Sequence, residues 1–359
     1  GLIILASSLS SPCYAFLRSF RQMKKYSIFM IANTYGQIGL IAYLVLNGHG
    51  ILSMVLAILA IRVVIFFILF FLIKSQIGIR RPHFSRIKEY LSFGLPTIPR
   101  TLALWVVTSS DRYVIGYFLG AASVGVYSAG YALGEIPFMA ANVISFVLLP
   151  ALSKLYDEGR MNEVKIHLSY SLKYLLAIAI PFVFGAAILA EPVLRLFSTA
   201  EIASQGYFIV PLIALSTLFL IAYVPIGHII ILVKKTRIIG TIWVIAALVN
   251  LGLNIVVVPH WGIFGAAITT LIAYILAMGL TIYYSSKEFK FNIDWRFIIK
   301  SLIASAVMSL VIWQISPQGN VATILTVVAG AATYGVVLLL LKGFKKEEFE
   351  FFKGLFQKG

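Results

Sequence analysis

One face of the apolar stretch 91–119 carries an arginine, an aspartate and three threonines. At about 100° per residue, their side chains fall within roughly 100° of one another on a helix. A charge inside a membrane span costs about 2.5 to 3.5 kcal/mol on insertion scales, so it usually faces a cavity or a partner. We therefore expect a wet cavity or a polar helix interface along this face. The stripe consists of Thr97, Arg100, Thr101, Thr108 and Asp111.

A second polar stripe lies on the following apolar stretch, 122–151. Its members fall within about 80° of one another and are Tyr127, Tyr131, Glu135, Asn142 and Ser145. A short Gly-Ala loop joins the two stretches, which predicts antiparallel neighbours whose stripes face the same cavity. Arg100 offers a forked donor suited to phosphate or carboxylate, while Asp111 and Glu135 suit a proton or sodium ion.

Structural roles remain open for several of these groups. Asp111 and Arg112 also fit an ion pair near the outer interface. Arg62 lies among apolar neighbours in the middle of 50–73, which fits either a cavity or a carboxylate partner on another helix. For Asn250 with Asn254, four residues apart, hydrogen bonding between helices is the simpler interpretation.

The elements that carry these residues are predicted to span a membrane. The chain has 359 residues, of which 60% are hydrophobic and 12% charged, and this composition excludes an ordinary soluble globule. Continuous apolar runs favour helices over the alternating strands of a barrel. We therefore predict an all-α integral membrane protein of about eleven transmembrane helices, at 1–17, 26–47, 50–73, 91–119, 122–151, 167–189, 205–232, 238–258, 261–285, 297–315 and 320–341.

Positive charge is distributed unequally between the two sets of loops. The loops after the odd-numbered stretches and the C-terminal tail hold 24 of the 29 Lys and Arg residues, whereas the opposite set holds only Arg195. The positive-inside rule places the first set, and the C-terminus, in the cytoplasm. Topology and anionic lipid therefore explain the net charge of +16 better than nucleic acid does.

Motifs of enzymes are missing from the sequence. There is no P-loop, no Gly-x-Ser-x-Gly and no His-Glu-x-x-His, and Cys13 is the single cysteine. We expect no enzymatic activity, no catalytic residue, no cofactor and no metal. Energy for uphill transport would then come from an ion gradient, the membrane potential or removal of the substrate.

Two loop motifs hint at a repeated set of helices. Lys24-Lys25 and Lys234-Lys235 are 210 residues apart, and the Gly50-Ile51 and Gly262-Ile263 pairs are 212 apart. Six predicted spans separate them, which suggests a parallel six-helix repeat. The first repeat would then start about 120 residues before Gly1, which leaves room for roughly three helices. Together with the absence of an initiating Met, this predicts an N-terminal truncation.

Several motifs resemble a known family. They are Phe16-Leu-Arg-Ser-Phe-Arg-Gln-Met-Lys-Lys-Tyr26, Tyr90-Leu-Ser-Phe-Gly-Leu-Pro-Thr-Ile-Pro99, Ser110-Asp-Arg-Tyr-Val-Ile-Gly-Tyr-Phe-Leu-Gly120 and Val124-Gly-Val-Tyr-Ser-Ala-Gly-Tyr131. They are similar to motifs of the Wzx-like polysaccharide (O-antigen) flippases of the multidrug/oligosaccharidyl-lipid/polysaccharide exporter superfamily. The chain would correspond to helices four to fourteen of that family.

The resemblance implies a two-lobed bundle, similar to multidrug and toxin extruders, that lacks its first three helices. It further implies a flippase that moves an undecaprenyl-pyrophosphate-linked oligosaccharide across the bacterial inner membrane by alternating access. Cationic cavity residues, here Arg62 and Arg100, would hold the pyrophosphate. The expected substrate-binding set is Arg62, Thr97, Arg100, Thr101, Tyr127, Tyr131 and Asn142, with Asp111 and Glu135 for ion coupling.

The same resemblance suggests how the chain divides. We expect the rest of an N-terminal lobe at 1–73, a basic cytoplasmic linker at 74–90 and a six-helix lobe at 91–285. Two further helices at 286–341 and an amphipathic cytoplasmic tail at 342–359 complete the chain. Membrane lipids, a proton or sodium ion and other polysaccharide assembly proteins are the further partners expected.

Two other functions compete with the flippase. A multidrug or metabolite cation antiporter of the same superfamily would favour acidic and aromatic cavity residues, and the arginines argue against it. A membrane enzyme of glycan assembly typically needs a large outer loop or an acidic metal motif. The longest predicted outer loop, Glu191 to Gly206, is too short for a domain.

Overall fold

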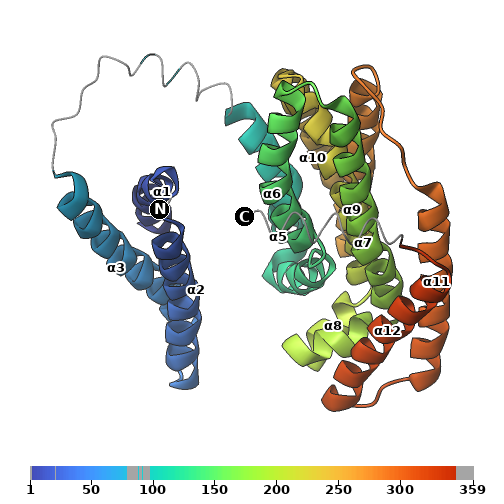
Figure 1. The fold of residues 1–359 in the computed structure, drawn as a ribbon. Helices are drawn as coiled ribbons and strands as arrows, with labels where there is room; N and C mark the ends of the chain where they lie inside the picture. The colour runs from blue at the N-terminus through green and yellow to red at the C-terminus, as the bar shows by residue number, and fades with distance from the viewer. Residues whose placement is uncertain (1, 21, 79–87, 89–90, 92–97, 345–359) are drawn as a thin grey trace. The chain divides into compact units, whose positions relative to one another are not determined.

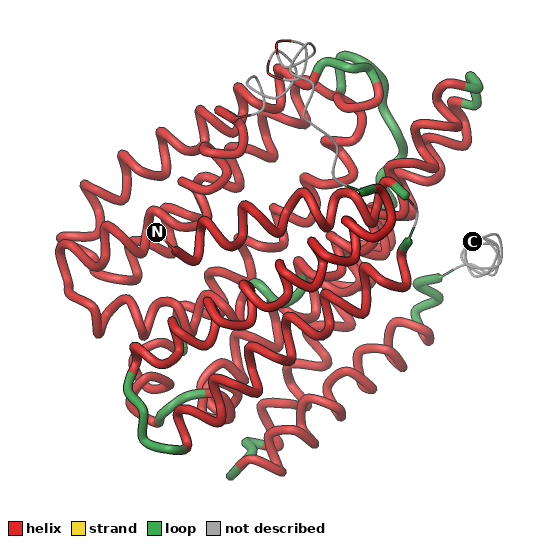
Figure 2. The backbone as a smooth tube through the Cα atoms, turned by 90° about the vertical axis from the view of Figure 1, so that its left-hand side faces the viewer, coloured by secondary structure: helices red, strands yellow, loops and turns green. Residues whose placement is uncertain are grey.

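The computed structural model describes residues 2–20, 22–78, 88, 91 and 98–344, apart from the side chains of Ile51 and Arg100. Every regular element within these ranges is a helix, and short loops join most successive helices (Figure 2). Most of the predicted linker at 74–90, Thr97, the Arg100 side chain and the tail from residue 345 onward lie outside the described residues.

The helices confirm an all-α membrane protein. Within the described ranges, ten helices are long and apolar enough to cross a membrane. Apolar helices of this length satisfy their backbone hydrogen bonds internally, as the hydrocarbon region requires.

The chain divides into two compact units, Gly1–Lys88 and Glu89–Gly359. The first unit contains α1 (Leu2–Ser19), α2 (Met23–Leu46) and α3 (Ile51–Ile77), shown in blue in Figure 1. Its small core lies mainly between α1 and α3 and is formed by Cys13, Leu17, Ile65 and Leu69. At one end, the Gln22 amide donates a hydrogen bond to Gln76, with 2.9 Å between Nε2 and Oε1.

The second unit contains eight described helices (Figure 1). They are α5 (Ile98–Gly134), α6 (Phe138–Asp157), α7 (Met161–Phe197), α8 (Ala200–Gly206), α9 (Ile209–Leu232), α10 (Thr236–Ser285), α11 (Trp295–Ile315) and α12 (Asn320–Leu340). Helix α9 is the most deeply buried candidate span and packs against α5, α6, α7 and α10. The short helix α8 connects α7 to α9.

Helices α5 and α10 are each a pair of antiparallel helices. Gly120 in α5 has φ 83° and ψ 171°, and Gly262 in α10 has φ 60° and ψ −148°. Residues on the two sides of Gly120 meet, as the contact from Tyr127 back to Asp111 shows. We count the two arms of α5 and of α10 separately, count α6 together with the second arm of α5, and leave out the short α8. The described helices then make eleven membrane passes. The eleven predicted stretches match these passes.

The predicted stretch 122–151 is not one continuous helix. Helix α5 ends at Gly134 and α6 begins at Phe138. Pro137 stands at the junction, where it has no amide hydrogen to donate and where its ring would clash with a carbonyl of the preceding turn. The prediction that Asn142 and Ser145 continue the stripe of Tyr127 and Tyr131 on one straight helix is therefore wrong.

Two glycines let the second arm of α5 approach α9 closely. A Cβ atom added to Gly130 would lie 2.8 Å from the Ile209 Cβ, and one added to Gly134 would lie 2.8 Å from the Ile213 Cβ. The same added atom on Gly134 would lie 2.9 Å from the Val210 carbonyl oxygen, which belongs to the backbone. Small residues four apart allow this close helix packing in membranes.

Replacing Gly134 tests this contact. We expect Gly134→Ala to lower the free energy of unfolding by about 1 to 3 kcal/mol, because α9 must shift to admit the methyl group. Gly125→Ala is the matched control, since it lies on the same helical arm with nothing within 4 Å of the added Cβ. Thermal unfolding in detergent measures both, and equal midpoints for the two variants would contradict the proposed close packing.

Candidate functional site

Asp111 is the most completely buried charged residue described, with 0% of its surface exposed. The Tyr127 hydroxyl donates a hydrogen bond to its Oδ2 over 2.5 Å, and the Arg112 backbone amide donates to Oδ1 over 2.8 Å. A hydrogen bond that involves an ionised group is short and about twice as strong as a neutral one. The two arms of α5 are therefore joined through this carboxylate.

Arg112 lies beside Asp111 and faces the second arm of α5. Its Nη1 atom is 3.9 Å from Asp111 Oδ1 and donates a hydrogen bond of 2.8 Å to the Thr108 carbonyl oxygen. Its guanidinium carbon lies 4.6 Å from the centre of the Tyr131 ring. The aromatic face and the carboxylate both compensate for removing this charge from water.

Polar contacts continue from α5 into α10. The Tyr131 and Tyr274 hydroxyl oxygens are 3.4 Å apart. The Asn254 amide donates to Asn250, and the Thr269 hydroxyl donates to Asn254 across the α10 hairpin, over 3.3 and 2.9 Å. We call this cluster the polar core; it consists of Ser110, Asp111, Arg112, Tyr127, Ser128, Tyr131, Asn250, Asn254, Thr269 and Tyr274.

The structure brings three of the predicted site residues together. Asp111, Tyr127 and Tyr131 all belong to the polar core, and the two tyrosines are buried. Glu135 lies beyond the end of α5, and both it and Asn142 on α6 are exposed. The stripes predicted from spacing therefore separate into a buried part and an exposed part.

The remaining predicted residues lie elsewhere. Thr101 is exposed on the first arm of α5. Thr97 and the Arg100 side chain are outside the described residues. Arg62 is half-buried in the first unit, where its guanidinium donates a hydrogen bond to the Ser7 hydroxyl of α1. A guanidinium has five N–H donors, so most of them stay available after this contact.

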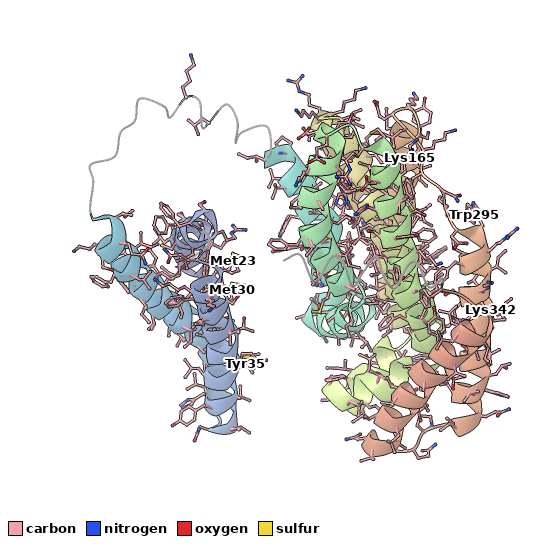
Figure 3. All side chains as sticks on the ribbon, in the orientation of Figure 1. Met23, Met30, Tyr35, Lys165, Trp295 and Lys342 are labelled. Atoms are coloured by element: carbon pink, nitrogen blue, oxygen red, sulfur yellow. The ribbon has the colours of Figure 1, made fainter. Side chains whose placement is uncertain are left out.

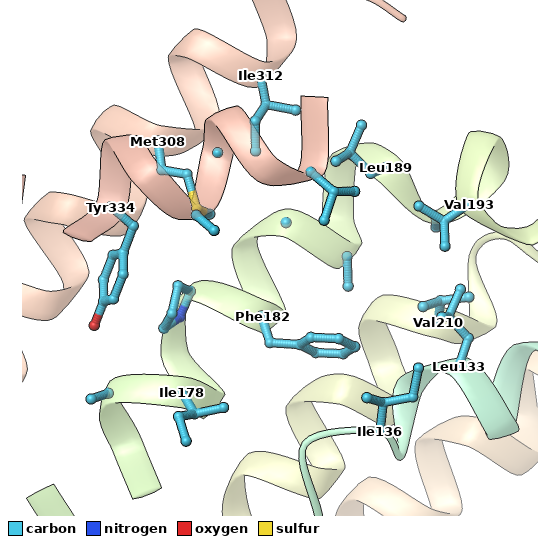
Figure 4. A pocket seen from close by; sticks show the side chains of 18 of the residues that line it. Leu133, Ile136, Ile178, Phe182, Leu189, Val193, Val210, Met308, Ile312 and Tyr334 are labelled. Atoms are coloured by element: carbon cyan, nitrogen blue, oxygen red, sulfur yellow. The ribbon is translucent and has the colours of Figure 1, made fainter. Parts of the chain in front are cut away.

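An apolar groove of about 450 Å³ lies in the second unit (Figure 4). Side chains from α5, α7, α9, α11 and α12 line it. They include Leu133, Phe182, Leu189, Val210, Met308, Ile312 and Tyr334 (Figure 4). Its lining is almost entirely hydrocarbon, which suits a lipid chain rather than a sugar or an ion.

Sequence reasoning missed the partners that arrive from distant helices. Tyr274 meets Tyr131 across 143 residues of chain, and no spacing rule links the two positions. Pro181 and Gly185 on α7 line the groove, but in an apolar stretch such residues give no sign of a cavity. Arg112 was recognised only as a structural ion-pair partner of Asp111, and its contact with Tyr131 was not anticipated.

These features define a multi-span helical membrane protein with a polar core and an apolar groove in one unit. The family model described as "Polysaccharide biosynthesis protein" matches residues 1–203, which is more than half of the chain. The chain therefore belongs to the polysaccharide biosynthesis protein family.

Two relatives come from Haloferax volcanii. The probable flippase AglR is 27% identical over 240 residues, covering 64% of this chain and 50% of AglR. The probable low-salt glycan biosynthesis flippase Agl15 is 19% identical over 281 residues, covering 77% of this chain and 59% of Agl15. A third relative, the teichuronic acid biosynthesis protein TuaB of Bacillus subtilis, is 22% identical over 283 residues. The alignment covers 72% of this chain and 54% of TuaB. The chain spans between half and three fifths of the length of these relatives.

A solved structure shares the fold. The lipid II flippase MurJ in an inward closed conformation superposes with a TM-score of 0.80 at 21% identity. The match covers 95% of this chain and 72% of the MurJ chain. This similarity shows that the chain shares the fold of MurJ.

The polar core predicts how two substitutions differ. We expect Tyr127→Phe to lower the free energy of unfolding by about 1.5 to 3 kcal/mol, because Asp111 loses a charge-assisted hydrogen bond while it stays buried. We expect a smaller loss for Asp111→Asn. Its one amide oxygen still accepts from Tyr127 and only the contact with the Arg112 amide is lost, while no charge is buried any longer. Thermal unfolding in detergent measures both changes.

The control for this pair is Tyr113→Phe, which lies on the first arm of α5 with Asp111 and whose side chain is exposed. A Tyr127→Phe variant as stable as Tyr113→Phe would show that the hydrogen bond does not hold the α5 hairpin.

Proposed function

We propose that the protein containing this chain is a flippase for a lipid-linked oligosaccharide of the undecaprenyl-pyrophosphate type. The observation that carries the proposal is the apolar groove beside a polar core in a member of the polysaccharide biosynthesis family. A lipid-linked sugar needs both surfaces, since its chain must stay in hydrocarbon while its head group crosses. The flippase names of the relatives and the shared fold support the same function.

The groove supplies a place for part of the lipid chain. It lies where α7, α11 and α12 meet, and its one phenol, Tyr334, hydrogen-bonds the Ser301 hydroxyl over 2.9 Å. That contact engages the phenol with protein, so the groove presents mainly methyl, methylene and aromatic carbon. An isoprenoid chain finds there a surface as apolar as the bilayer, and dispersion contacts rather than removal from water would hold it.

The pyrophosphate is proposed to bind Arg62 and Arg100. Forked guanidinium donors match phosphate oxygens in geometry as well as charge. Arg62 is half-buried on a helix with apolar neighbours. Because little water surrounds it there, its attraction to an anion is weakly screened. Thr97, Thr101 and Asn142 are proposed to contact the sugar, and Tyr127 and Tyr131 to shape the site from within the polar core.

Of the two carboxylates proposed for ion coupling, Glu135 is the more accessible. It is exposed at the break between α5 and α6, where a proton or sodium ion can reach it. An ion reaches Asp111 only when the Tyr127 hydrogen bond opens. We therefore propose Glu135 as the first ion-binding group. Asp111 is proposed to bind an ion only when the two arms of α5 separate.

The proposed location is the bacterial inner membrane with the C-terminus in the cytoplasm. The excess of Lys and Arg in one set of loops supports this orientation. Polysaccharide assembly proteins that make or extend the same lipid-linked sugar are the proposed protein partners.

A transport assay with the whole protein in proteoliposomes tests the function. It follows protection of an undecaprenyl-pyrophosphate oligosaccharide from an external glycan-modifying enzyme, with and without a proton or sodium gradient. We expect transport to fall about tenfold or more in Arg62→Gln, because an arginine-phosphate contact is worth about 1.5 to 3 kcal/mol. Arg100→Gln should behave in the same way.

Ser7→Ala is the matched control for Arg62. It removes the helix-to-helix hydrogen bond that Arg62 makes and leaves the guanidinium in place. Equal losses in Arg62→Gln and Ser7→Ala would assign Arg62 a structural role. Export of organic cations without movement of lipid-linked sugar would replace the flippase by a cation antiporter.

The groove is tested by filling it. We expect Ala331→Trp to reduce transport severalfold, because the indole would occupy space proposed for the lipid chain. Val328→Trp is the control, since Val328 is exposed on the same helix and does not line the groove. The same proteoliposome assay compares the two variants. Unimpaired transport in Ala331→Trp would show that the lipid chain does not bind in this groove.

A further inference from the structure

A second cavity lies in the second unit, at the end of the bundle where α7 and α11 begin. Its volume is about 780 Å³, and the α10–α11 loop, the first turns of α7 and α11 and residues 342–343 form its walls. Figure 3 labels three of its lining residues, Lys165, Trp295 and Lys342. Unlike the apolar groove, this cavity is largely polar.

The cavity has a large excess of positive charge. Among the described residues that line it, one is a carboxylate, Asp294, and six have cationic side chains: Lys165, Lys173, Lys290, Arg296, Lys300 and Lys342. Like charges held this close repel one another. A concave site of one sign beside low-dielectric walls also concentrates counter-ions.

The carboxylate is already engaged within the protein. Asp294 Oδ1 accepts a hydrogen bond of 2.9 Å from the Phe297 amide and so caps α11, while Oδ2 is 3.2 Å from Lys173 Nζ. Lys173 is only 4% exposed, and its ammonium lies 4.8 Å from the centre of the Phe297 ring. Asp294 therefore neutralises the deepest cation of the cavity.

Within the part of the chain that the structure describes, the cations nearer the opening have no carboxylate of their own. Lys300 Nζ donates a hydrogen bond of 2.9 Å to the Lys342 carbonyl oxygen, which carries no net charge. Among the described residues, no Asp or Glu oxygen lies within 4 Å of the side-chain nitrogens of Lys165, Lys290 or Arg296. These three side chains are the free charge of the cavity.

The cavity lies at the ends of two candidate membrane spans, where lipid head groups are expected. Trp295 at the first position of α11 is 66% exposed, and exposed tryptophans at the ends of spans typically mark the membrane–water interface. Ile166, Phe291 and Ile293 add apolar surface to the lining beside the cations. The combination fits an amphiphile with an anionic head better than it fits a soluble anion.

We propose that this cavity binds the phosphate-bearing head group of an anionic phospholipid from the adjacent leaflet. Basic pockets between transmembrane helices on the cytoplasmic side are suited to such head groups. The bound lipid would tie the α10–α11 loop to α7 and to residues 342–343, and so hold α11 and α12 against the rest of the unit. The site is separate from the groove and from the residues proposed to bind the transported lipid.

Lipid binding to the purified whole protein tests the proposal without any transport step. Native mass spectrometry in detergent counts bound dioleoyl phosphatidylglycerol and dioleoyl phosphatidylcholine, and thermal unfolding is followed with the same lipids and with inorganic phosphate. We expect phosphatidylglycerol alone to bind and to raise the unfolding midpoint. In the triple variant Lys165→Gln, Lys290→Gln, Arg296→Gln, its affinity should fall about 100-fold, because each cation contributes about 1 kcal/mol.

A second triple variant controls for loss of overall charge. Lys154→Gln, Lys234→Gln, Arg237→Gln removes three exposed cations of the same unit that do not line the cavity, and it should bind phosphatidylglycerol like the wild type. Equal weakening in both triple variants would show a non-specific charge effect and overturn the site. An equal rise in the unfolding midpoint with millimolar inorganic phosphate would overturn the lipid as the ligand, in favour of a soluble anion.

Discussion

The buried carboxylate of Asp111 is the group on which the arrangement of the second unit depends. A charge in hydrocarbon needs donors, and in this chain they come from the next residue and from Tyr127, sixteen residues further along. Tyr127 reaches Asp111 only because the chain reverses at Gly120, where φ is 83°. The same reversal places Tyr131 over Arg112 and toward Tyr274 of α10. The hairpin and its polar contacts therefore require each other.

One helical arm separates the two environments proposed for transport. Tyr131 belongs to the polar core, while Leu133 lines the apolar groove. Two residues along an α-helix turn by about 200°, so the two side chains point to nearly opposite faces. Gly134 brings the same arm into contact with α9, which contributes Val210 to the groove. A shift of this arm would change the core and the groove together, which is the coupling that a flippase needs.

The spans could be predicted from the sequence because hydropathy reports burial in lipid directly. The antiparallel arms joined at Gly120 were also predictable, since a short loop leaves neighbouring spans no other choice. The junction at Pro137 was missed, although proline gave a local signal for it. The Tyr131–Tyr274 contact and the groove were beyond reach, because packing between distant apolar helices leaves no periodic trace in a single sequence.

Some charged side chains of this protein are already neutralised by partners within it and others are not. This difference determines which of them can bind a ligand. The half-buried Arg112 and the buried Lys173 are each matched by a carboxylate and an aromatic ring. Such pairs offset their own desolvation and leave little attraction for a substrate. Arg62 has only the Ser7 hydroxyl as a hydrogen-bond partner among the described residues, so its full charge is not neutralised. Under the proposed function, a pyrophosphate would therefore find its counter-charge at positions like Arg62 rather than in the polar core, where the ionic groups already satisfy one another.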